Sequence, residues 1–290
     1  MSLVKCKRRA EVNEEQSRYW NEQGGPKWAA MQQQLDAQLE PLGRAAVDEL
    51  KLEPSEHVLD IGCGAGATSL ALAAHVAPGD VLGLDISEPL LARARERAAG
   101  VSNLRFQQGD AQTFAFSGRP FDVLFSRFGV MFFAEPMAAF ANLRSALRPG
   151  GRVGFVCWRD MSENPWATLP IEAALPHLPT APEPPVPGAP GPFAFADGAR
   201  VRDILERAGY VEPVVARHDS DLVLGGAGGL DGAVYVALQV GPLGRALASL
   251  DDDTRAKARR AVRDAFARHE GPLGVTLPAA VWLVTARRGD

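Results

Sequence analysis

The chain has 290 residues, with 31 lysines and arginines against 35 aspartates and glutamates, so its formal net charge is −4. A mildly acidic chain lacks the basic surface that nucleic-acid and anionic-membrane binding require. Cys6, Cys63 and Cys157 form no CxxC pair, so the sequence predicts neither a disulfide framework nor a metal site. No apolar run reaches the roughly 18 residues of a membrane span. A soluble, cytoplasmic protein is expected.

The first half of the chain shows an alternating pattern of predicted elements. Residues 11–50 are expected to be helical, because apolar side chains recur at three- and four-residue steps from Trp28 to Leu42. Beyond residue 56, five strands are predicted at 57–61, 81–86, 104–107, 121–126 and 152–158, with helices at 67–76, 87–100 and 136–147. Strands that alternate with helices in this way predict a doubly wound, parallel α/β sheet.

The pattern changes after Trp158. Residues 161–198 are rich in proline, and ten of the 22 prolines lie within 165–192. Further along, a helix is predicted at 199–208, a sixth strand at 211–217, a largely helical stretch at 226–270 and a final strand at 280–287. Long irregular segments inside a domain are usually functional or disordered. We therefore expect the Pro-rich segment to be a wall or lid over a substrate pocket, with a disordered linker as the alternative.

The clearest motif is the stretch DIGCGAG at 60–66, at the end of the first predicted strand and just before a helix. Glycines in such a turn allow positive φ and close approach of a ligand, and the helix N-terminus presents N–H groups. Asp85, 19 residues after Gly66, ends the second strand, where it can bind ribose hydroxyls. Asp110 ends the third strand, where it can bind an adenine amino group. A loose match to the G-x-G-x-x-[G/A] pattern keeps a nicotinamide cofactor open.

Together with the PGG turn at 149–151, these motifs resemble those of the class I S-adenosylmethionine-dependent methyltransferases. The segments LDIGCGAG, LDIS, GDA and LRPGG are most similar to the ubiquinone/menaquinone methyltransferase-like, small-molecule branch, over about residues 56–158. The resemblance implies a Rossmann-like, seven-stranded, mostly parallel sheet of order 3-2-1-4-5-7-6 whose last strand is antiparallel. It divides the chain into an N-terminal helical lid segment (1–50), a cofactor-binding core (51–160), a Pro-rich acceptor-side segment (161–198) and a C-terminal part (199–290) with a helical insertion (218–279).

The resemblance also implies S-adenosylmethionine as cofactor and a set of residues that bind it. In such enzymes the methionine part lies on the stretch matching 60–66, the ribose on the residue matching Asp85 and the adenine amine on the residue matching Asp110. Trp28 belongs to a segment that commonly folds over the cofactor; packing on the sheet alone is the alternative. The expected cofactor-binding residues are Asp60, Gly62, Cys63, Gly64, Gly66, Asp85, Ile86, Asp110, Ala111, Ser126, Arg127 and Trp28.

Catalytic residues are harder to assign. A sulfonium methyl group is already activated, so the protein supplies mainly proximity, alignment and a water-poor site. Ligands of open α/β sheets lie at the carboxyl ends of the strands, and the candidates near those ends are Arg127, Asp160, His177 and His218. Arg127 is expected either to bind an acidic substrate or to pair with Asp160.

The predicted activity is methyl transfer from S-adenosylmethionine to a small organic acceptor by in-line SN2 displacement, without a metal, nucleic acid or membrane partner. The acceptor, the choice among O-, N- and C-methylation, and the formation of a homodimer stay open. An NAD(P)-dependent oxidoreductase is one alternative. The other is a non-catalytic protein that binds S-adenosylmethionine, because no general base stands out in the sequence.

Overall fold

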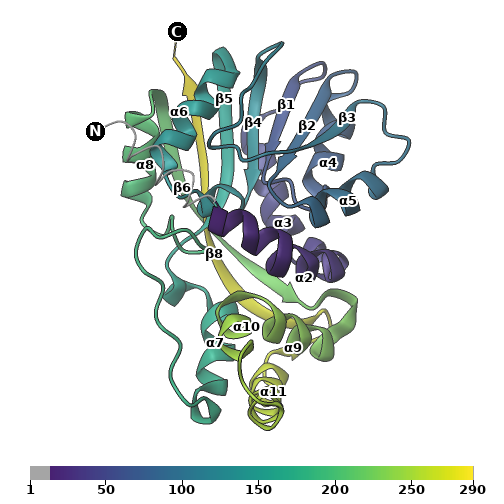
Figure 1. Cartoon of the computed structure of the whole chain (residues 1–290), viewed down its shortest axis with the longest axis vertical. Helices are drawn as coiled ribbons and strands as arrows, with labels where there is room; N and C mark the ends of the chain where they lie inside the picture. Colours follow the sequence, from purple (N-terminus) through teal and green to yellow (C-terminus); the bar gives the residue numbers. More distant parts are fainter. Residues whose placement is uncertain (1–13, 290) are drawn as a thin grey trace.

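The computed structural model describes residues 14–289, and a mostly parallel β-sheet forms its centre (Figure 1). The strands follow the order β3-β2-β1-β4-β5-β8-β6. They are β1 (His57–Ile61), β2 (Asp80–Asp85), β3 (Leu104–Gln108), β4 (Phe121–Arg127), β5 (Leu147–Trp158), β6 (Tyr210–Leu224), β7 (Glu270–Gly271) and β8 (Gly274–Arg288). β8 is antiparallel to both β5 and β6, which confirms the predicted order and direction. The short β7 pairs with β8 and adds an eighth strand that was not predicted.

Helices cover both faces of the sheet (Figure 1). α3 (Gln32–Leu50), α4 (Ala67–Val76) and α5 (Glu88–Arg97) share one face, and α6 (Pro136–Ala146) and α8 (Gly198–Arg207) share the other. Helices on both faces bury the central strands. All five residues of β1 are buried, the apolar Val58, Leu59 and Ile61 together with His57 and Asp60.

The N-terminal segment is helical, as predicted, but it is not one helix. A π-helix, η1 (Tyr19–Gln23), leads into α2 (Gly24–Ala30), and Met31 separates α2 from α3 with φ −103° and ψ 17°. Leu35, Leu39 and Leu42 are buried, in agreement with the apolar stripe. Residues 11–13 of the predicted helix lie outside the described residues.

β6 and β8 are each 15 residues long and extend past the rest of the sheet as a two-stranded ribbon. Around this ribbon lie α7 (Pro165–Ala174), α9 (Gly229–Gln239), α10 (Gly241–Leu247) and α11 (Asp252–Ala267), which form the lower part of Figure 1 and are called the helical cap below. The predicted insertion at 218–279 is therefore wrong at both ends, since 218–224 and 274–279 are strand. This half of β6 begins with four consecutive polar residues, 218–221, so it lacks the apolar run of a buried strand.

The Pro-rich segment is only partly irregular. It begins with two short helical elements, η3 (Met161–Glu163) and α7, and continues with η4 (Leu175–His177). Pro165 occupies the first position of α7. A backbone N–H at this position has no partner within the helix, so proline, which lacks one, costs no hydrogen bond there. The expectation of coil is wrong for this first part, whereas residues 178–197 contain neither helix nor strand.

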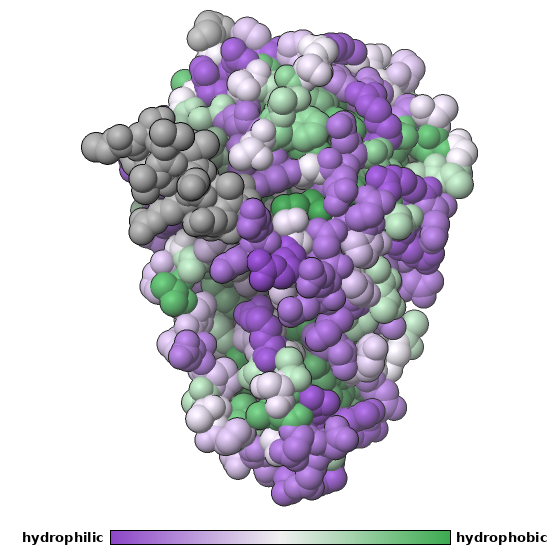
Figure 2. Space-filling view, viewed as in Figure 1, coloured by the Kyte–Doolittle hydropathy of each residue, from purple (hydrophilic) through white to green (hydrophobic). Residues whose placement is uncertain are grey.

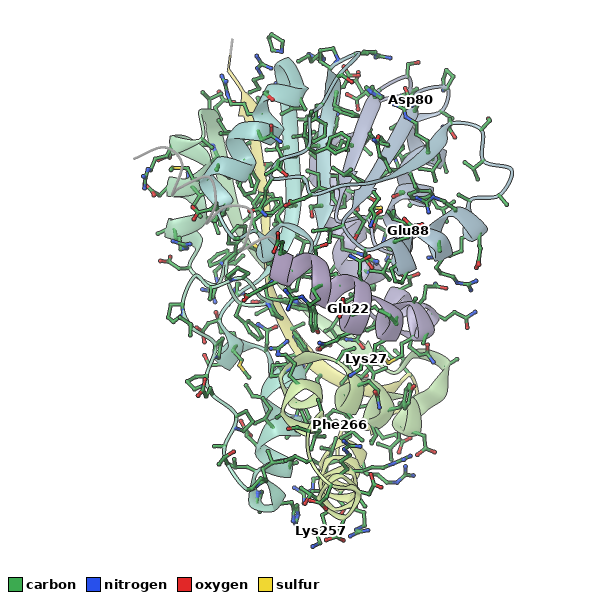
Figure 3. All side chains as sticks on the ribbon, in the orientation of Figure 1. Glu22, Lys27, Asp80, Glu88, Lys257 and Phe266 are labelled. Carbon is green, nitrogen blue, oxygen red and sulfur yellow. The ribbon has the colours of Figure 1, made fainter. Side chains whose placement is uncertain are left out.

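The helical cap has a hydrophilic surface and an apolar interior. The face in Figure 2 is mostly hydrophilic, above all at the lower end, where Figure 1 places α11. Figure 3 marks Lys257 at that outer end and Phe266 inside the cap, where Phe266 is fully buried. Phe266 belongs to the same hydrophobic cluster as the strands of the sheet. Within residues 14–289, no helix combines the length and apolar character needed to span a bilayer.

Asn164 joins the helical cap to the sheet. Its side chain is fully buried at the start of α7. Nδ2 donates to the carbonyl oxygens of Asp160 (2.9 Å) and Ala280 (3.2 Å), while Oδ1 accepts from the N–H of Ala280 (3.0 Å) and from Nε1 of Trp166 (3.0 Å). Because both polar atoms are bonded, this one amide fixes β8, α7 and the Trp166 ring relative to one another.

We expect Asn164→Ala to lower the free energy of unfolding by about 2–3 kcal/mol, since the buried N–H and carbonyl groups that it leaves unpaired keep their desolvation penalty. Urea denaturation followed by circular dichroism measures this change. Gln33→Ala removes an exposed amide from α3 and should change stability by less than about 0.5 kcal/mol. Equal effects of the two substitutions would contradict the assigned role of Asn164.

Candidate functional site

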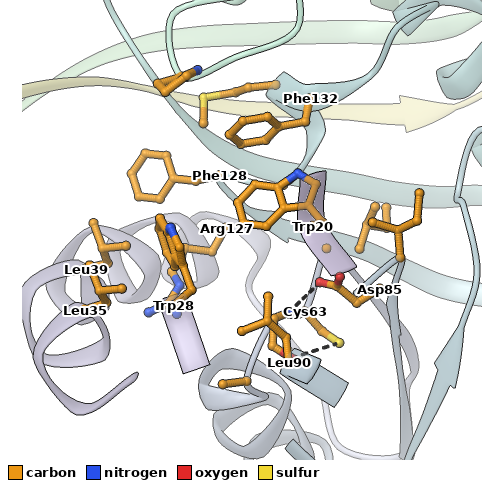
Figure 4. A pocket seen from close by; sticks show the side chains of 18 of the residues that line it. Trp20, Trp28, Leu35, Leu39, Cys63, Asp85, Leu90, Arg127, Phe128 and Phe132 are labelled. Atoms are coloured by element: carbon orange, nitrogen blue, oxygen red, sulfur yellow. Dashed lines mark hydrogen bonds between the residues drawn. The ribbon is translucent and has the colours of Figure 1, made fainter. Parts of the chain in front are cut away.

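A cavity of about 220 Å³ lies at the carboxyl ends of the parallel strands (Figure 4). It lies between the sheet, the N-terminal helices and the helical cap. The sheet contributes residues 62–65 after β1, Asp85 and Ile86 at β2, 109–112 after β3, 127–129 at β4 and Trp158 of β5; the N-terminal helices contribute Trp20, Trp28 and Asp36; the cap contributes Trp166, Val240, Gly241 and Arg245. The cavity thus joins segments that are far apart in the sequence.

The glycine-rich loop after β1 forms one wall of the cavity. Gly62 and Gly64 have φ values of +64° and +55°, in the left-handed region that favours glycine. A Cβ atom at Gly62 would lie 2.8 Å from the Cα of Gly129, so this position also requires a close approach between two loops. A Cβ atom at Gly64 would meet no atom within 4 Å, because Gly64 faces open space. The loop therefore exposes bare backbone to the cavity.

Asp85 holds this loop in place. One of its carboxylate oxygens accepts from the N–H of Gly64 (2.7 Å) and the other from the N–H of Ser87 (2.8 Å); Figure 4 shows the first bond as a dashed line. Burial raises the pKa of the Asp85 carboxyl above its usual range. Each oxygen keeps a further acceptor site, so Asp85 can also accept hydrogen bonds from a ligand hydroxyl in the cavity.

Asp60 lies beneath the loop and does not line the cavity. It is 1% exposed; Oδ2 accepts from the Ser69 hydroxyl (2.6 Å), and Oδ1 has no partner among the described residues. Burial raises the pKa of its carboxyl to about 7. Ser126 is also behind the wall, where its hydroxyl donates to the carbonyl of Ile61 (2.8 Å) and accepts from the N–H of Gly129 (3.2 Å). These side chains support the loops that a ligand would touch.

Most of the expected cofactor-binding residues meet at the cavity. Those that line it are Trp28, Gly62, Cys63, Gly64, Asp85, Ile86, Asp110, Ala111 and Arg127. Gly66 begins α4 just behind the loop, and Asp60 and Ser126 lie below it. The Cys63 thiol is buried, and burial together with the nearby Asp85 and Asp60 raises its pKa well above the usual range, so it stays protonated. Cys63 therefore packs in the loop and does not serve as a nucleophile.

Of the four catalytic candidates, only Arg127 lines the cavity. Asp160 caps η3, where it accepts from the N–H (2.9 Å) and hydroxyl (2.6 Å) of Ser162, and His177 ends η4. His218 lies on the ribbon, paired with Val281.

The expected pair of Arg127 with Asp160 is wrong. Nη2 of Arg127 instead donates to Asp36 at 3.0 Å. Asp36 also pairs with Arg97 of α5 at 2.9 Å. Both pairs exist because α3 crosses the strand ends, which the local sequence around Arg127 does not reveal.

The N-terminal helices close one side of the cavity; residues 19–30 are called the lid segment below. The Ser87 hydroxyl donates to the carbonyl of Trp20 (2.7 Å), and Oδ1 of Asn21 accepts from the N–H of Glu88 (3.0 Å). This contact requires glycine at position 25, because a Cβ atom there would lie only 2.0 Å from the Trp20 carbonyl oxygen and 2.3 Å from the Ser87 hydroxyl. The lid segment is thus bonded to the loop that directly follows Asp85.

Aromatic rings form much of the remaining wall. The Trp20 ring meets Phe132 edge-on, with centroids 5.1 Å apart, and Figure 4 shows Trp20 between Asp85 and Phe132. Phe128 stacks on Trp158 with centroids 4.3 Å apart. Phe128 has φ +60°, which is unusual for a bulky residue and is found mainly where surrounding structure and function require it.

The sheet order, the glycine-rich loop and the carboxylates after β2 and β3 together define a Rossmann-like methyltransferase fold. Residues 58–151 match a family model described as a methyltransferase domain. Nocamycin O-methyltransferase of Saccharothrix syringae is 32% identical over 194 residues, which are 63% of this chain and 69% of that protein. Aklanonic acid methyltransferase DauC of Streptomyces sp. (strain C5) is 36% identical over 118 residues, 40% of this chain and 54% of that protein.

A solved structure shows the same fold. Phosphoethanolamine N-methyltransferase 2 of Haemonchus contortus, in complex with phosphomonomethylethanolamine and S-adenosylhomocysteine, has a TM-score of 0.53 and 15% identity, covering 86% of this chain and 53% of that one. The chain belongs to the class I S-adenosylmethionine-dependent methyltransferase family, and its cofactor is S-adenosylmethionine. Family membership decides against the nicotinamide oxidoreductase.

The buried Asp60 carboxyl makes a pH dependence of stability testable. Its pKa is about 7 in the folded protein and about 3.9 in an unfolded chain. Between those values the folded protein holds a proton that the unfolded chain has lost, so this group lowers stability as the pH rises. The free energy of unfolding of Asp60→Asn, relative to the unaltered protein, should therefore increase from about pH 4 to pH 7 and then stay level.

Denaturant titrations of the ligand-free protein at several pH values measure this difference. Asp160→Asn is the control, because hydrogen bonds from Ser162 lower the pKa of Asp160 in the folded protein, so its carboxyl is ionised in both the folded and the unfolded chain above about pH 5. Its difference should stay level from about pH 5 to pH 7, where that of Asp60→Asn still rises. A level curve for Asp60→Asn as well would show that Asp60 is ionised in the folded protein throughout the window.

Proposed function

We propose that this protein transfers a methyl group from S-adenosylmethionine to a small organic acceptor, and that cofactor and acceptor occupy two halves of one cavity. The observation that carries the proposal is the continuity of the lining. Residues 62–65, Asp85 and Asp110 form one half, and Trp28, Phe132 and Trp166 belong to the other. Two relatives are named for nocamycin and aklanonic acid, which supports a small molecule as acceptor.

In the cofactor half, the residues match the chemistry of a nucleoside joined to an amino acid. Asp85 would accept from the ribose hydroxyls and Asp110 from the adenine amine, while the backbone of residues 62–65 would face the methionine part. Arg127 uses one N–H on Asp36, and a guanidinium group has five donors, so Arg127 can also pair with the methionine carboxylate. The Trp28 ring would lie near the sulfonium, where cation–π attraction is favourable.

When bound, S-adenosylmethionine supplies a methyl group on a positively charged sulfur, and in-line displacement forms the bond from carbon to the acceptor while sulfur keeps the electrons of the broken bond. The chain contributes position and exclusion of water, through the lid segment and the aromatic walls. Among the described residues that line the cavity, none is a histidine. The carboxylates of Asp36, Asp85 and Asp110 already accept hydrogen bonds. An acceptor that ionises without a strong base suits this site.

S-adenosylmethionine should raise the midpoint of thermal unfolding, because a ligand that binds only the folded state stabilises it, whereas NADH should not. With a panel of hydroxylated and acidic aromatic acceptors, mass spectrometry should detect S-adenosylhomocysteine.

Asp85→Asn should weaken binding of S-adenosylmethionine roughly 10- to 100-fold, the effect of losing a charged hydrogen bond. Calorimetry measures this affinity.

Asp80→Asn is the matched control, since Asp80 begins the same strand at the opposite edge of the sheet (Figure 3). It should leave the affinity unchanged. Unchanged affinity in Asp85→Asn would remove the ribose assignment. Thermal protection without methyl transfer to any acceptor would favour the alternative of a non-catalytic protein that binds the cofactor.

A second substitution tests the lid segment. Gly25→Ala should separate this segment from the loop after β2, because the new Cβ atom has no room beside Trp20 and Ser87. We expect about tenfold weaker cofactor binding, the scale of one or two lost hydrogen bonds, and faster proteolysis near residue 30. Gly228→Ala, at a position with open space around its Cα, should change neither. Full cofactor affinity in Gly25→Ala would show that the lid segment does not contribute to binding.

A further inference from the structure

The end of the cavity formed by α3 and the helical cap contains two polar side chains without partners. Gln38 lies on α3, is 7% exposed, and its Oε1 has no hydrogen-bond partner among the described residues. Arg245 lies on α10 and is exposed, and no hydrogen bond or ion pair joins its guanidinium group to another residue of 14–289. Both side chains line the cavity. A buried amide without a partner costs free energy, and this points to a ligand that completes its bonding.

The walls around these two groups are apolar and largely aromatic. Trp28, Trp166 and Val240 line the cavity together with them. The Trp166 ring is held in place by its bond to Asn164 and lies 4.6 Å from the Trp158 ring, centroid to centroid. Beyond Gln38 and Trp166 there is an apolar recess of about 40 Å³ between α7, α9 and α10. Fixed indole rings of this kind suit a flat, conjugated molecule.

We propose that the acceptor, under the function proposed above, is a planar aromatic acid. Its ring system lies against Trp28 and Trp166, its ionised acid group pairs with Arg245, and a hydroxyl or carbonyl group next to it bonds to the amide of Gln38. A guanidinium group binds a carboxylate through two parallel hydrogen bonds, and an amide both donates and accepts. The two side chains therefore select for a charged group and a neutral polar group on the same ring.

The test compares 1-hydroxy-2-naphthoate with 1-naphthol, which share the ring and hydroxyl and differ in the carboxylate. Titration calorimetry on protein saturated with S-adenosylhomocysteine should show the naphthoate binding roughly 2- to 5-fold more tightly, because Arg245 is exposed and solvent screens its ion pairs. Arg245→Gln should abolish this preference without changing the affinity for 1-naphthol. Arg259→Gln, which removes the same charge from an exposed position on α11, should keep the preference.

Gln38→Leu gives a second, independent readout. It should lower the binding affinity of both compounds by the same factor, because both carry the hydroxyl group that bonds to the amide of Gln38. Equal affinities of the two compounds for the unaltered protein would overturn the proposal. Weaker binding of S-adenosylhomocysteine by Arg245→Gln would also overturn it, since Arg245 would then belong to the cofactor half.

The two proposals fail in different ways. If the unaltered protein does not bind S-adenosylhomocysteine, the proposed methyltransferase function is wrong. If it binds S-adenosylhomocysteine but shows no preference for the naphthoate, only the assignment of an acidic acceptor is wrong. Quenching of tryptophan fluorescence locates the bound compound, because four of the five tryptophans, Trp20, Trp28, Trp158 and Trp166, line the cavity.

Discussion

The buried carboxylate of Asp85 connects three parts of the cavity. It accepts from Gly64 on the glycine-rich loop and from Ser87 at the start of α5. Ser87 in turn holds the carbonyl of Trp20 on the lid segment. Charge-assisted bonds to backbone N–H groups are strong in a site of low dielectric constant. The loop, the end of β2 and the lid segment therefore keep fixed positions around the same carboxylate, and the shape of the cofactor half depends on it.

The other half of the cavity depends on the long ribbon of β6 and β8. The ribbon carries the helical cap away from the sheet, and Asn164 then ties α7 back to β8 and orients Trp166. The cofactor half is made by strand ends and loops that any protein of this fold needs. The proposed acceptor half is made largely by helices outside the sheet, with α7 before β6 and α9 to α11 between β6 and β8. Its chemistry can therefore change without disturbing the proposed cofactor half.

Local patterns in the sequence predict the first of these halves and not the second. β1, β2 and β4 are short, mostly apolar runs, and the alternation of strands with helices then places Asp85 at the end of β2 and Asp110 just after β3. Gln38 and Arg245 belong to no motif, and they come together only through tertiary packing of α3 against the cap. The second half of β6 was missed because it begins with four consecutive polar residues, 218–221, on a partly exposed ribbon. The start of α7 was missed because proline at the first helical position resembles a coil signal.

Two buried carboxyl groups beside the cavity bear on how the site distinguishes cofactor from product. Burial raises the pKa of Asp60 to about 7 and that of Asp85 above its usual range. A nearby cation favours the ionised form of a carboxyl group and opposes this effect of burial. Under the proposed function, the cofactor brings a sulfonium charge that its demethylated product lacks. Where these carboxyl groups are ionised, they would therefore favour the sulfonium of the cofactor over its neutral product.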